Sequence, residues 1–553
     1  MASGRAVSYR VPGDFAAIQD VDAAQKWAMS SRSRPGPGLS REASSAQRQR
    51  GGGAIILQAE GGARPILDGT GVAGATMVLI ANRSYVTLRG FEIRGNTGVN
   101  DGSGIRVIGS GSHIELRDNL IHDLRGTSAM GITVYGTSTT AAITNLVIDG
   151  NEMHDCDAAP SEAITLNGNV DGFVVAHNYV HDVNNIGIDM IGGEADINPQ
   201  YVTRNGQCVA NTILRARSTY GGGYAAGLYV DGARDLLVQG NFISQCDLGL
   251  EVGAEHAQVD ATGITVRDNV IHGNDKAGLV FGGYDASVGR VRQCVFMNNV
   301  CHHNDRLHVG LGELWIQHAQ DNVLRNNLFV ADDQGVLMYS EDGNAQNQLD
   351  YNAWHTTATL PAFVWRGQLY PSFASYRAGT AQDAHSQFAD PLLVSPAQGD
   401  FHLADTSPCI DAGNPADVFI GSDAAQHPRV LDGKLSGTLR IDIGAYEHAN
   451  IALAASGTAA RGSLLTIDLT GAPALPSLLL LGTAPLATLL PPYGTLAIDL
   501  AAPRFFLVTG ALPRSLALAI PQGLPSGFAI VLQGLIVNAS GGNLSNAVLA
   551  VVP

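Results

Sequence analysis

Three acidic residues stand at corresponding positions of short apolar segments along the chain. Asp189 lies in GIDM, Asp231 ends GLYVD, and Glu251 lies in GLEV. The apolar residues of each segment alternate with other residues, as in a β-strand with one buried face, so the acids should point outward. Carboxylates gathered on one surface can serve as general acid, base or nucleophile, because neighbouring charges move their proton affinities apart.

A repeated pattern must position these acids. An Asn between apolar pairs recurs about every 25 to 33 residues, at Asn119, Asn151, Asn178, Asn211, Asn241, Asn269, Asn299, Asn327 and Asn352. A strand of the form Gly-apolar-x-apolar follows nearly every Asn. Short repeats with period-2 alternation indicate stacked coils, in which each strand pairs with its counterpart in the next coil. The sequence therefore predicts an all-β protein built on a right-handed parallel β-helix, with the asparagines as a structural ladder.

The composition predicts three parts. In residues 1–53, apolar residues three apart between Phe15 and Trp27 indicate an amphipathic capping helix, followed by a low-complexity, mobile linker. Residues 54–449 hold the β-helix and a closing segment. Residues 450–553 contain only five charged side chains and alternate apolar strands with Gly and Pro turns, which predicts a small β-sandwich accessory domain.

The charge balance limits the partners. A formal net charge of −17 over 553 residues disfavours nucleic acid and anionic membrane surfaces. No apolar run has transmembrane length, and MASGRAVSYR lacks the apolar core of a signal peptide. We expect an extracellular or cell-surface protein whose signal peptide has been removed, with an intracellular protein as the alternative. The six cysteines lack metal-type spacing, so we expect buried thiols. Nothing in the sequence indicates an oligomeric state.

The strand pattern also predicts which residues share a face. In Gly-apolar-x-apolar-y, the outward residues x should form a column, namely Arg106, Thr133, Thr165, Asp189, Tyr229, Glu251, Val280, Trp315 and Leu337. Residues y should form a second column, namely Ile108, Tyr135, Asn167, Ile191, Asp231, Gly253, Gly282, Gln317 and Tyr339. Asp231 and Glu251 would lie one coil apart and two residues out of step, with Cα atoms about 8 Å apart. Their carboxyl groups could then lie about 5.5 to 9 Å apart, which covers the retaining and the inverting geometry of glycosidases.

Other side chains could complete a groove on this face. Tyr229 and Trp315 could stack on sugar rings. The predicted substrate-binding residues are Tyr229, Trp315, Glu255, His256, Arg234, Glu194, Tyr284 and Glu313. The Gly-rich insertion at 214–226 should wall the groove. His122, His154, His181 and His272 recur after the Asn turn and are interpreted as a structural column.

Two alternatives for the acids remain open. Outward carboxylates on a β-helix are usually solvated surface. Alternatively, Asp189, Asp231 and Glu251 could bind Ca²⁺, since carboxylates with backbone oxygens suit a hard cation. The expectation is therefore either no cofactor or a calcium ion.

The coil pattern over about residues 54–355 resembles the pectate-lyase-like β-helix superfamily, which implies a polysaccharide lyase or a glycoside hydrolase. GLYVDG, followed one coil later by LGLEVGAEH, is similar to the paired-carboxylate coils of β-helical glycosidases such as the β-xylosidases. The resemblance implies Asp231 as nucleophile and Glu251 as general acid/base, with Asp189 as a third acid. The segment ending in DIGAYEH resembles the closing segment of many secreted bacterial β-helix proteins.

The favoured hypothesis is a retaining glycoside hydrolase acting on a poly- or oligosaccharide. The first alternative is a Ca²⁺-dependent lyase that cleaves a uronate-containing glycan by β-elimination. NIGID and GLVFGG resemble the calcium and base coils of one pectate lyase family, but Val280 stands where that family has Lys. The second alternative is a surface β-helix that binds glycans without cleaving them.

Overall fold

The computed structural model describes residues 6–11, 44–49, 55–59, 64–71, 76–472, 475–491, 493–537, 539 and 542–553. The predicted capping helix lies outside the described residues. β1 (Ala6–Val11) pairs antiparallel with β2 (Ser44–Gln49), and β2 pairs antiparallel with β3 (Ile55–Ala59). β2 lies within the segment predicted to be a linker, and its backbone extends the first sheet of the solenoid.

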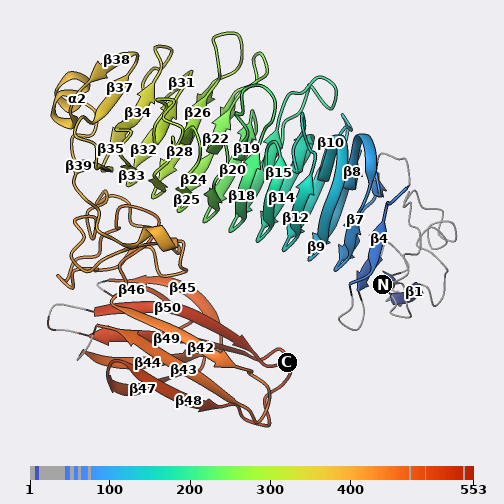
Figure 1. Cartoon of the computed structure of the whole chain (residues 1–553). Coiled ribbons are helices and arrows are strands. Elements are labelled where there is room, and N and C mark those ends of the chain that lie inside the picture. The colour runs from blue at the N-terminus through green and yellow to red at the C-terminus, as the bar shows by residue number, and fades with distance from the viewer. Residues whose placement is uncertain are drawn as a thin grey trace.

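The predicted right-handed parallel β-helix is confirmed (Figure 1). Its coils contribute strands to three parallel sheets, called A, B and C. Sheet A continues from β3 through β6 (Val86–Arg89), β9 (Gly111–Arg117), β11 (Ile143–Asp149), β14 (Val170–Ala176), β17 (Arg204–Val209), β20 (Arg234–Gln239), β24 (Thr265–Arg267), β28 (Val295–Met297), β32 (Val323–Arg325) and β35 (Gln348–Asp350). Short strands flank it at β23 (Ala261–Thr262), β27 (Val291–Arg292) and β31 (Ala319–Gln320).

Sheets B and C follow sheet A in each coil. Sheet B comprises β4 (Ile66–Asp68), β7 (Glu92–Arg94), the first part of β10 (Leu120–Gly136), β12 (Glu152–Cys156), β15 (Tyr179–Asn184), β18 (Thr212–Arg217), β21 (Phe242–Ser244), β25 (Val270–His272), β29 (Val300–His302), β33 (Leu328–Ala331), β36 (Ala353–Thr356) and β39 (Gln387–Phe388). Sheet C comprises β5 (Val78–Ala81), β8 (Thr97–Ile108), the second part of β10, β13 (Ile164–Gly168), β16 (Ile188–Ile191), β19 (Ala226–Asp231), β22 (Leu248–Gly253), β26 (Ala277–Gly282), β30 (Leu314–Ile316), β34 (Val336–Ser340), β37 (Ala362–Trp365) and β38 (Gln368–Tyr370).

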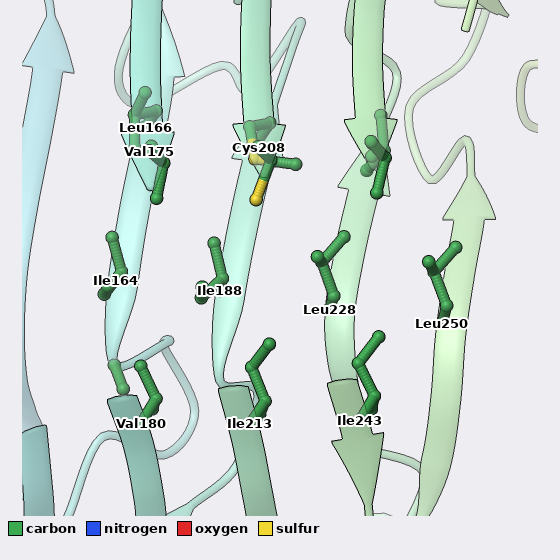
Figure 2. Close-up of a cluster of buried hydrophobic side chains, with 14 of the residues drawn as sticks. Ile164, Leu166, Val175, Val180, Ile188, Cys208, Ile213, Leu228, Ile243 and Leu250 are labelled. Atoms are coloured by element: carbon green, nitrogen blue, oxygen red, sulfur yellow. The ribbon is translucent and has the colours of Figure 1, made fainter. Parts of the chain in front are cut away.

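The core consists of stacked apolar side chains inside the coils. Figure 2 shows one column from sheet C, in which Ile164, Ile188, Leu228 and Leu250 succeed one another in register. All four are fully buried. Because burying one Leu or Ile contributes about 1.5–3 kcal/mol, a repeat of two inward residues per strand stabilises each coil against the next.

The predicted asparagine ladder is confirmed at the bend between sheets A and B. From Asn119 to Asn327, each side-chain amide donates to the Oδ1 of the next rung over 2.9–3.1 Å. The same Oδ1 atoms accept the backbone N–H of the preceding rung, so the buried polar groups of the bend are satisfied.

The closing segment covers the last coil with α2 (Phe373–Thr380) and then packs along the outer face of sheet B. It also contains β40 (Leu393–Ser395), the 3-10 turn η1 (Pro396–Gln398) and β41 (Asp400–Leu403). Phe401, Ile410 and Ile443 cover Val300 and Leu328 on the outer face of sheet B. This segment therefore buries a face of the coils that would otherwise expose apolar side chains.

The C-terminal part forms two antiparallel sheets and a hairpin. One sheet holds β42 (Ile451–Gly457), β43 (Leu464–Gly471) and β48 (Arg514–Ala519). The other holds β44 (Pro476–Gly482), β47 (Arg504–Ala511), β49 (Ala529–Val537) and β50 (Gly542–Val551), and β45 (Pro485–Leu490) pairs with β46 (Gly494–Ile498). Ile467 and Leu469 of the first sheet pack with Leu479 and Leu532 of the second, as in a β-sandwich.

All six cysteines are buried and unpaired, as expected. Among the described residues, no helix has the length and apolar content needed to cross a membrane.

Candidate functional site

The outward face of sheet C carries the predicted acids in register. Tyr229 pairs with Asp189 on one side and with Glu251 on the other, and Asp231 pairs with Gly253. Asp231 and Glu251 therefore lie on adjacent coils of one face, two residues out of step. The column continues beyond Glu251 through Val280 and Trp315 to Tyr339.

The predicted column is wrong at its last position. Leu337 is fully buried in the core, and Tyr339 takes the place beside Trp315. The pattern around Gly335 gave the wrong parity because β34 pairs Met338 with Leu314, which aligns Tyr339 and not Leu337 with Trp315.

Two cavities open on this face. The aromatic cavity, about 300 Å³, is bordered by Tyr220, Tyr224, Tyr229, Tyr284 and Trp315, together with Glu251 and Glu255. The acidic cavity, about 330 Å³, is bordered by Glu162, Asp189, Glu194, Asp231, Glu255 and His256. Ile186, Tyr220, Tyr229 and Glu255 border both, so the cavities share a wall and form one groove.

Tyr229 divides the groove. A Cβ at Gly253 would lie 2.4 Å from the Tyr229 hydroxyl oxygen, so the phenol ring occupies the space above that glycine. The hydroxyl donates to Glu255 Oε1 over 2.9 Å. Glu251 borders the aromatic cavity and Asp231 the acidic one, on opposite sides of the ring.

Asp231 is held by the segment that follows the next strand. Its side chain is 4% exposed, and its Oδ1 accepts the Glu255 backbone N–H over 2.7 Å. His256 Nε2 lies 3.5 Å from the other oxygen. Burial, followed by the Glu255 carboxylate, raises the pKa of Asp231 well above its usual range. Once ionised, this carboxylate is a stronger base than a solvated one.

Glu251 is partly buried at the floor of the aromatic cavity. Burial raises its pKa to about 8, and the Glu255 and Asp231 carboxylates add to the shift. Glu251 therefore holds a proton at neutral pH, as a general acid must.

A second acidic pair occupies the floor of the acidic cavity. Asp189 is 2% exposed, and its Oδ1 has no hydrogen-bond partner among the described residues. Beside it, Glu162 accepts the Thr165 hydroxyl over 2.5 Å. Burial and then the Glu162 carboxylate raise the pKa of Asp189, and burial raises the pKa of Glu162 to about 7.

Sequence reasoning missed Glu162, and it included Tyr220 only as part of the 214–226 insertion predicted to wall the groove. Glu162 lies in a turn, three residues before Thr165 of the outward column, where strand periodicity gives no direction. The signal that could have found it is its place at the same coil corner as the 214–226 insertion, because corresponding turns of successive coils stack.

The 218–225 turn forms a wall of both cavities and is firmly anchored. Asp247 Oδ2 accepts the backbone N–H groups of Ser218 and Ala225 over 2.8 and 3.1 Å. Lys276 bonds the Gly222 carbonyl, and its ammonium lies 3.5 Å from the centre of the Tyr224 ring. The Tyr220 hydroxyl donates to the Pro160 carbonyl over 3.3 Å, two coils away.

Two predicted groove residues lie elsewhere. Arg234 begins β20 and pairs with Arg204 on sheet A, because the chain turns onto the next wall at Gly232. Glu313 is fully buried and accepts the backbone and side-chain N–H groups of Asn304 over 2.8 and 2.6 Å. Both substrate-binding predictions are corrected, since neither residue borders the aromatic or the acidic cavity. Glu194, whose carboxylate accepts the Asn167 amide, and Tyr284 do border the groove.

The three acids suggested for calcium do not converge. In the described part of the chain, Asp189, Asp231 and Glu251 do not form a group whose ligand atoms lie within 4.8 Å of one another. Glu251 borders the aromatic cavity, whereas Asp189 and Asp231 border the acidic cavity on the other side of Tyr229. The arrangement does not fit a calcium ion held by all three, so no step below uses one.

The histidine column lies on sheet B, away from the groove. His122, His154 and His181 stack with ring centres 4.8 and 4.9 Å apart, and each Nδ1 bonds the Asp that follows it. These contacts agree with a structural column.

Comparison with known proteins places the chain among β-helical proteins. Residues 209–359 match the family described as right handed beta helix region. The uncharacterized protein YwoF of Bacillus subtilis strain 168 is 32% identical over 315 residues, which cover 55% of this chain and 67% of YwoF. The chain belongs to the YwoF family.

The solved structures are less similar to this chain than YwoF is. The DFA-IIIase of Arthrobacter chlorophenolicus A6, in complex with DFA-III, has 14% identity and a TM-score of 0.33, over 61% of this chain and 82% of that one. XylC in complex with xylose has 14% identity and a TM-score of 0.28, over 50% of this chain. The match spans 43% of XylC, less than half of its length. Such scores support no inference about activity.

Proposed function

We propose that the protein is a carbohydrate-active enzyme, a glycoside hydrolase that cleaves an oligo- or polysaccharide in the groove on sheet C. The supporting observation is the pair Asp231 and Glu251 on adjacent coils of one face, on either side of Tyr229. The five aromatic side chains of the aromatic cavity suit stacking against sugar rings. Acids beside such a surface are what cleavage of a glycosidic bond requires.

Glu251 is the proposed proton donor to the leaving oxygen. Its pKa of about 8 keeps it protonated at neutral pH, and burial strengthens its interaction with a developing charge. Activity should fall as pH rises through about 8, because Glu251 then loses its proton.

Asp231 is the proposed base that activates water. Its backbone contact with Glu255 fixes its direction, and this N–H donor favours the ionised carboxylate, the form that accepts a proton from water. The Tyr229 ring between the two acids favours the wide separation of inverting enzymes, about 6.5–9.5 Å, over the retaining geometry that the sequence resemblance implies. In this proposal Asp231 acts as a base and forms no covalent intermediate.

Substitution tests the two roles directly. Asp231→Asn and Glu251→Gln should each lower kcat about 10²- to 10⁴-fold on a cleaved glycan, as expected for lost acid–base catalysis. Glu251→Gln should also abolish the decline of activity near pH 8. Glu115→Gln removes an outward carboxylate from sheet A and serves as the matched control. Full activity in both groove variants on a glycan panel would exclude the pair.

Product stereochemistry separates the two geometries. Proton NMR of the first product formed should show the anomer opposite to that of the cleaved linkage. A product with the starting configuration would assign Asp231 as nucleophile and require movement of the Tyr229 ring.

The lining disfavours the lyase alternative. Among the described residues that border the two cavities there is no Lys or Arg, whereas elimination from a uronate needs a base and a positive counter-charge. Digests of polyuronates should therefore show no rise in ultraviolet absorbance from unsaturated products.

A further inference from the structure

The acidic cavity holds more carboxylates than cleavage requires. Glu162, Asp189, Glu194 and Glu255 border it in addition to Asp231. Within the described lining, His256 is the one side chain that can carry a positive charge. The nearest arginine on this face, Arg106, lies over the Tyr135 ring and pairs with Asp101 over 2.8 Å. This arginine does not border the acidic cavity, so it offers no direct contact to the acids there.

Two buried acceptor atoms of the cavity lack hydrogen-bond donors. Asp189 Oδ1 has no partner, and neither has the side-chain oxygen of Asn167, which is 1% exposed. The orientation of Asn167 is fixed because its amide nitrogen donates to Glu194. Both unpartnered atoms are acceptors, and buried acceptors without donors cost free energy. A ligand that brings N–H or O–H groups would satisfy them.

We infer that the acidic cavity binds the ammonium group of an amino sugar, so that the glycan substrate carries free, non-acetylated amino groups. This inference rests on the proposed function for the identity of the ligand as a glycan. An ammonium group supplies three donors and one positive charge. It would pair with Glu162 and Asp189 at the floor of the cavity and give Asp189 Oδ1 a donor. A uronate would bring further acceptors and negative charge, and it would be repelled.

Binding to a cleavage-deficient protein tests this inference. Glu251→Gln removes the proposed acid and leaves the acidic cavity intact, because Glu251 borders only the aromatic cavity. Calorimetry of this variant with glucosamine oligosaccharides should show binding at least tenfold tighter than with their N-acetylated counterparts. The affinity should weaken as salt increases, since the contacts are between charges. Galacturonate oligosaccharides should not bind.

Variants of the cavity floor identify the residues responsible. Glu162→Gln and Asp189→Asn, each added to Glu251→Gln, should weaken glucosamine binding at least tenfold while leaving N-acetylated ligands unaffected. Both replacements remove a buried like charge, so thermal unfolding should show folded proteins. Glu152→Gln, an outward carboxylate on sheet B, is the control and should not change binding.

Four outcomes would overturn the inference: equal affinity for free and acetylated ligands, preference for uronates, unchanged glucosamine binding in the floor variants, or tight Ca²⁺ binding that displaces glucosamine. Binding of glucosamine oligosaccharides without any cleavage by the wild type would refute the proposed hydrolase and leave this inference standing. If the wild type cleaves neutral glycans alone, the proposed hydrolase stands and this inference is refuted.

Discussion

Gly253 lies directly beneath the phenol of Tyr229. Replacing it with Ala would place a methyl group 2.4 Å from the hydroxyl oxygen and 2.6 Å from Cε2, so the ring must move. We expect Gly253→Ala to cost about 1–3 kcal/mol of unfolding free energy, as overpacking does, and to lower activity by opening the wall between the cavities. Urea unfolding and kinetics would measure both effects.

Two further variants serve as controls for Gly253→Ala. Tyr229→Phe keeps the ring and loses only the bond to Glu255, so its stability should fall by about 1 kcal/mol. Gly523→Ala adds a methyl group in open space and should be neutral. Wild-type stability and activity in Gly253→Ala would mean that the ring does not divide the groove.

At the residue scale, strand parity alone predicted part of the site. Asp189, Asp231 and Glu251 could be placed on one face because alternation is preserved through Gly-apolar-x-apolar. Glu162 could not, since it lies in a turn, and Arg234 was misplaced because the alternation stops at Gly232. The position of the Tyr229 ring depends on side-chain packing, which a periodic pattern does not encode.

At the scale of elements, the Asn ladder joins successive coils. Asn241 Oδ1 accepts the backbone and side-chain N–H groups of Asn211, and its amide donates to Asn269 and to the Cys208 carbonyl. We expect Asn241→Ala to cost about 3 kcal/mol in urea unfolding, because buried groups of both neighbours lose partners.

A matched substitution outside the ladder checks that cause. The Asn205 side chain is exposed, and its one hydrogen bond within the described residues is to Asp171. Asn205→Ala should cost about 1 kcal/mol, mainly through its left-handed backbone, φ 55°. Equal losses in the two variants would show that the ladder contributes no more than an ordinary turn.

The closing segment is fixed to the coils by a buried cation. Arg429 is fully buried, with Nε 3.5 Å from Asp268 and 3.4 Å from Glu447. Arg429→Met should cost about 3–5 kcal/mol, because it leaves buried acids without their partner, yet activity at saturating substrate should be retained. Chemical denaturation is the measurement, and Glu447→Gln added to Arg429→Met should recover part of the loss. A fully additive double variant would argue against direct coupling.

For the whole molecule, the buried acids predict how stability varies with pH. Burial raises the pKa of Glu162 to about 7 and of Glu251 to about 8. The folded state therefore holds these protons more tightly than the unfolded state, and the stability they contribute is lost as pH rises from about 4.5 through 8. We expect the unfolding temperature to fall by several degrees from pH 5 to pH 8.

Removing the two acids should flatten that decline. In the double variant Glu162→Gln and Glu251→Gln, differential scanning calorimetry should show a smaller difference between pH 5 and pH 8. A wild-type unfolding temperature that rises over this interval would mean that the groove carboxylates ionise without cost.

The hydrogen bond from the Tyr220 hydroxyl to the Pro160 carbonyl ties the 218–225 turn to a coil two repeats away. Because the 218–225 turn lies between β18 and β19, a homologue could have a shorter turn here and keep every coil. Such a protein would keep the acids and lose a wall of both cavities, so its groove would be wider. A change confined to this one corner of the coils would thus alter the width of the groove and leave the solenoid itself unchanged.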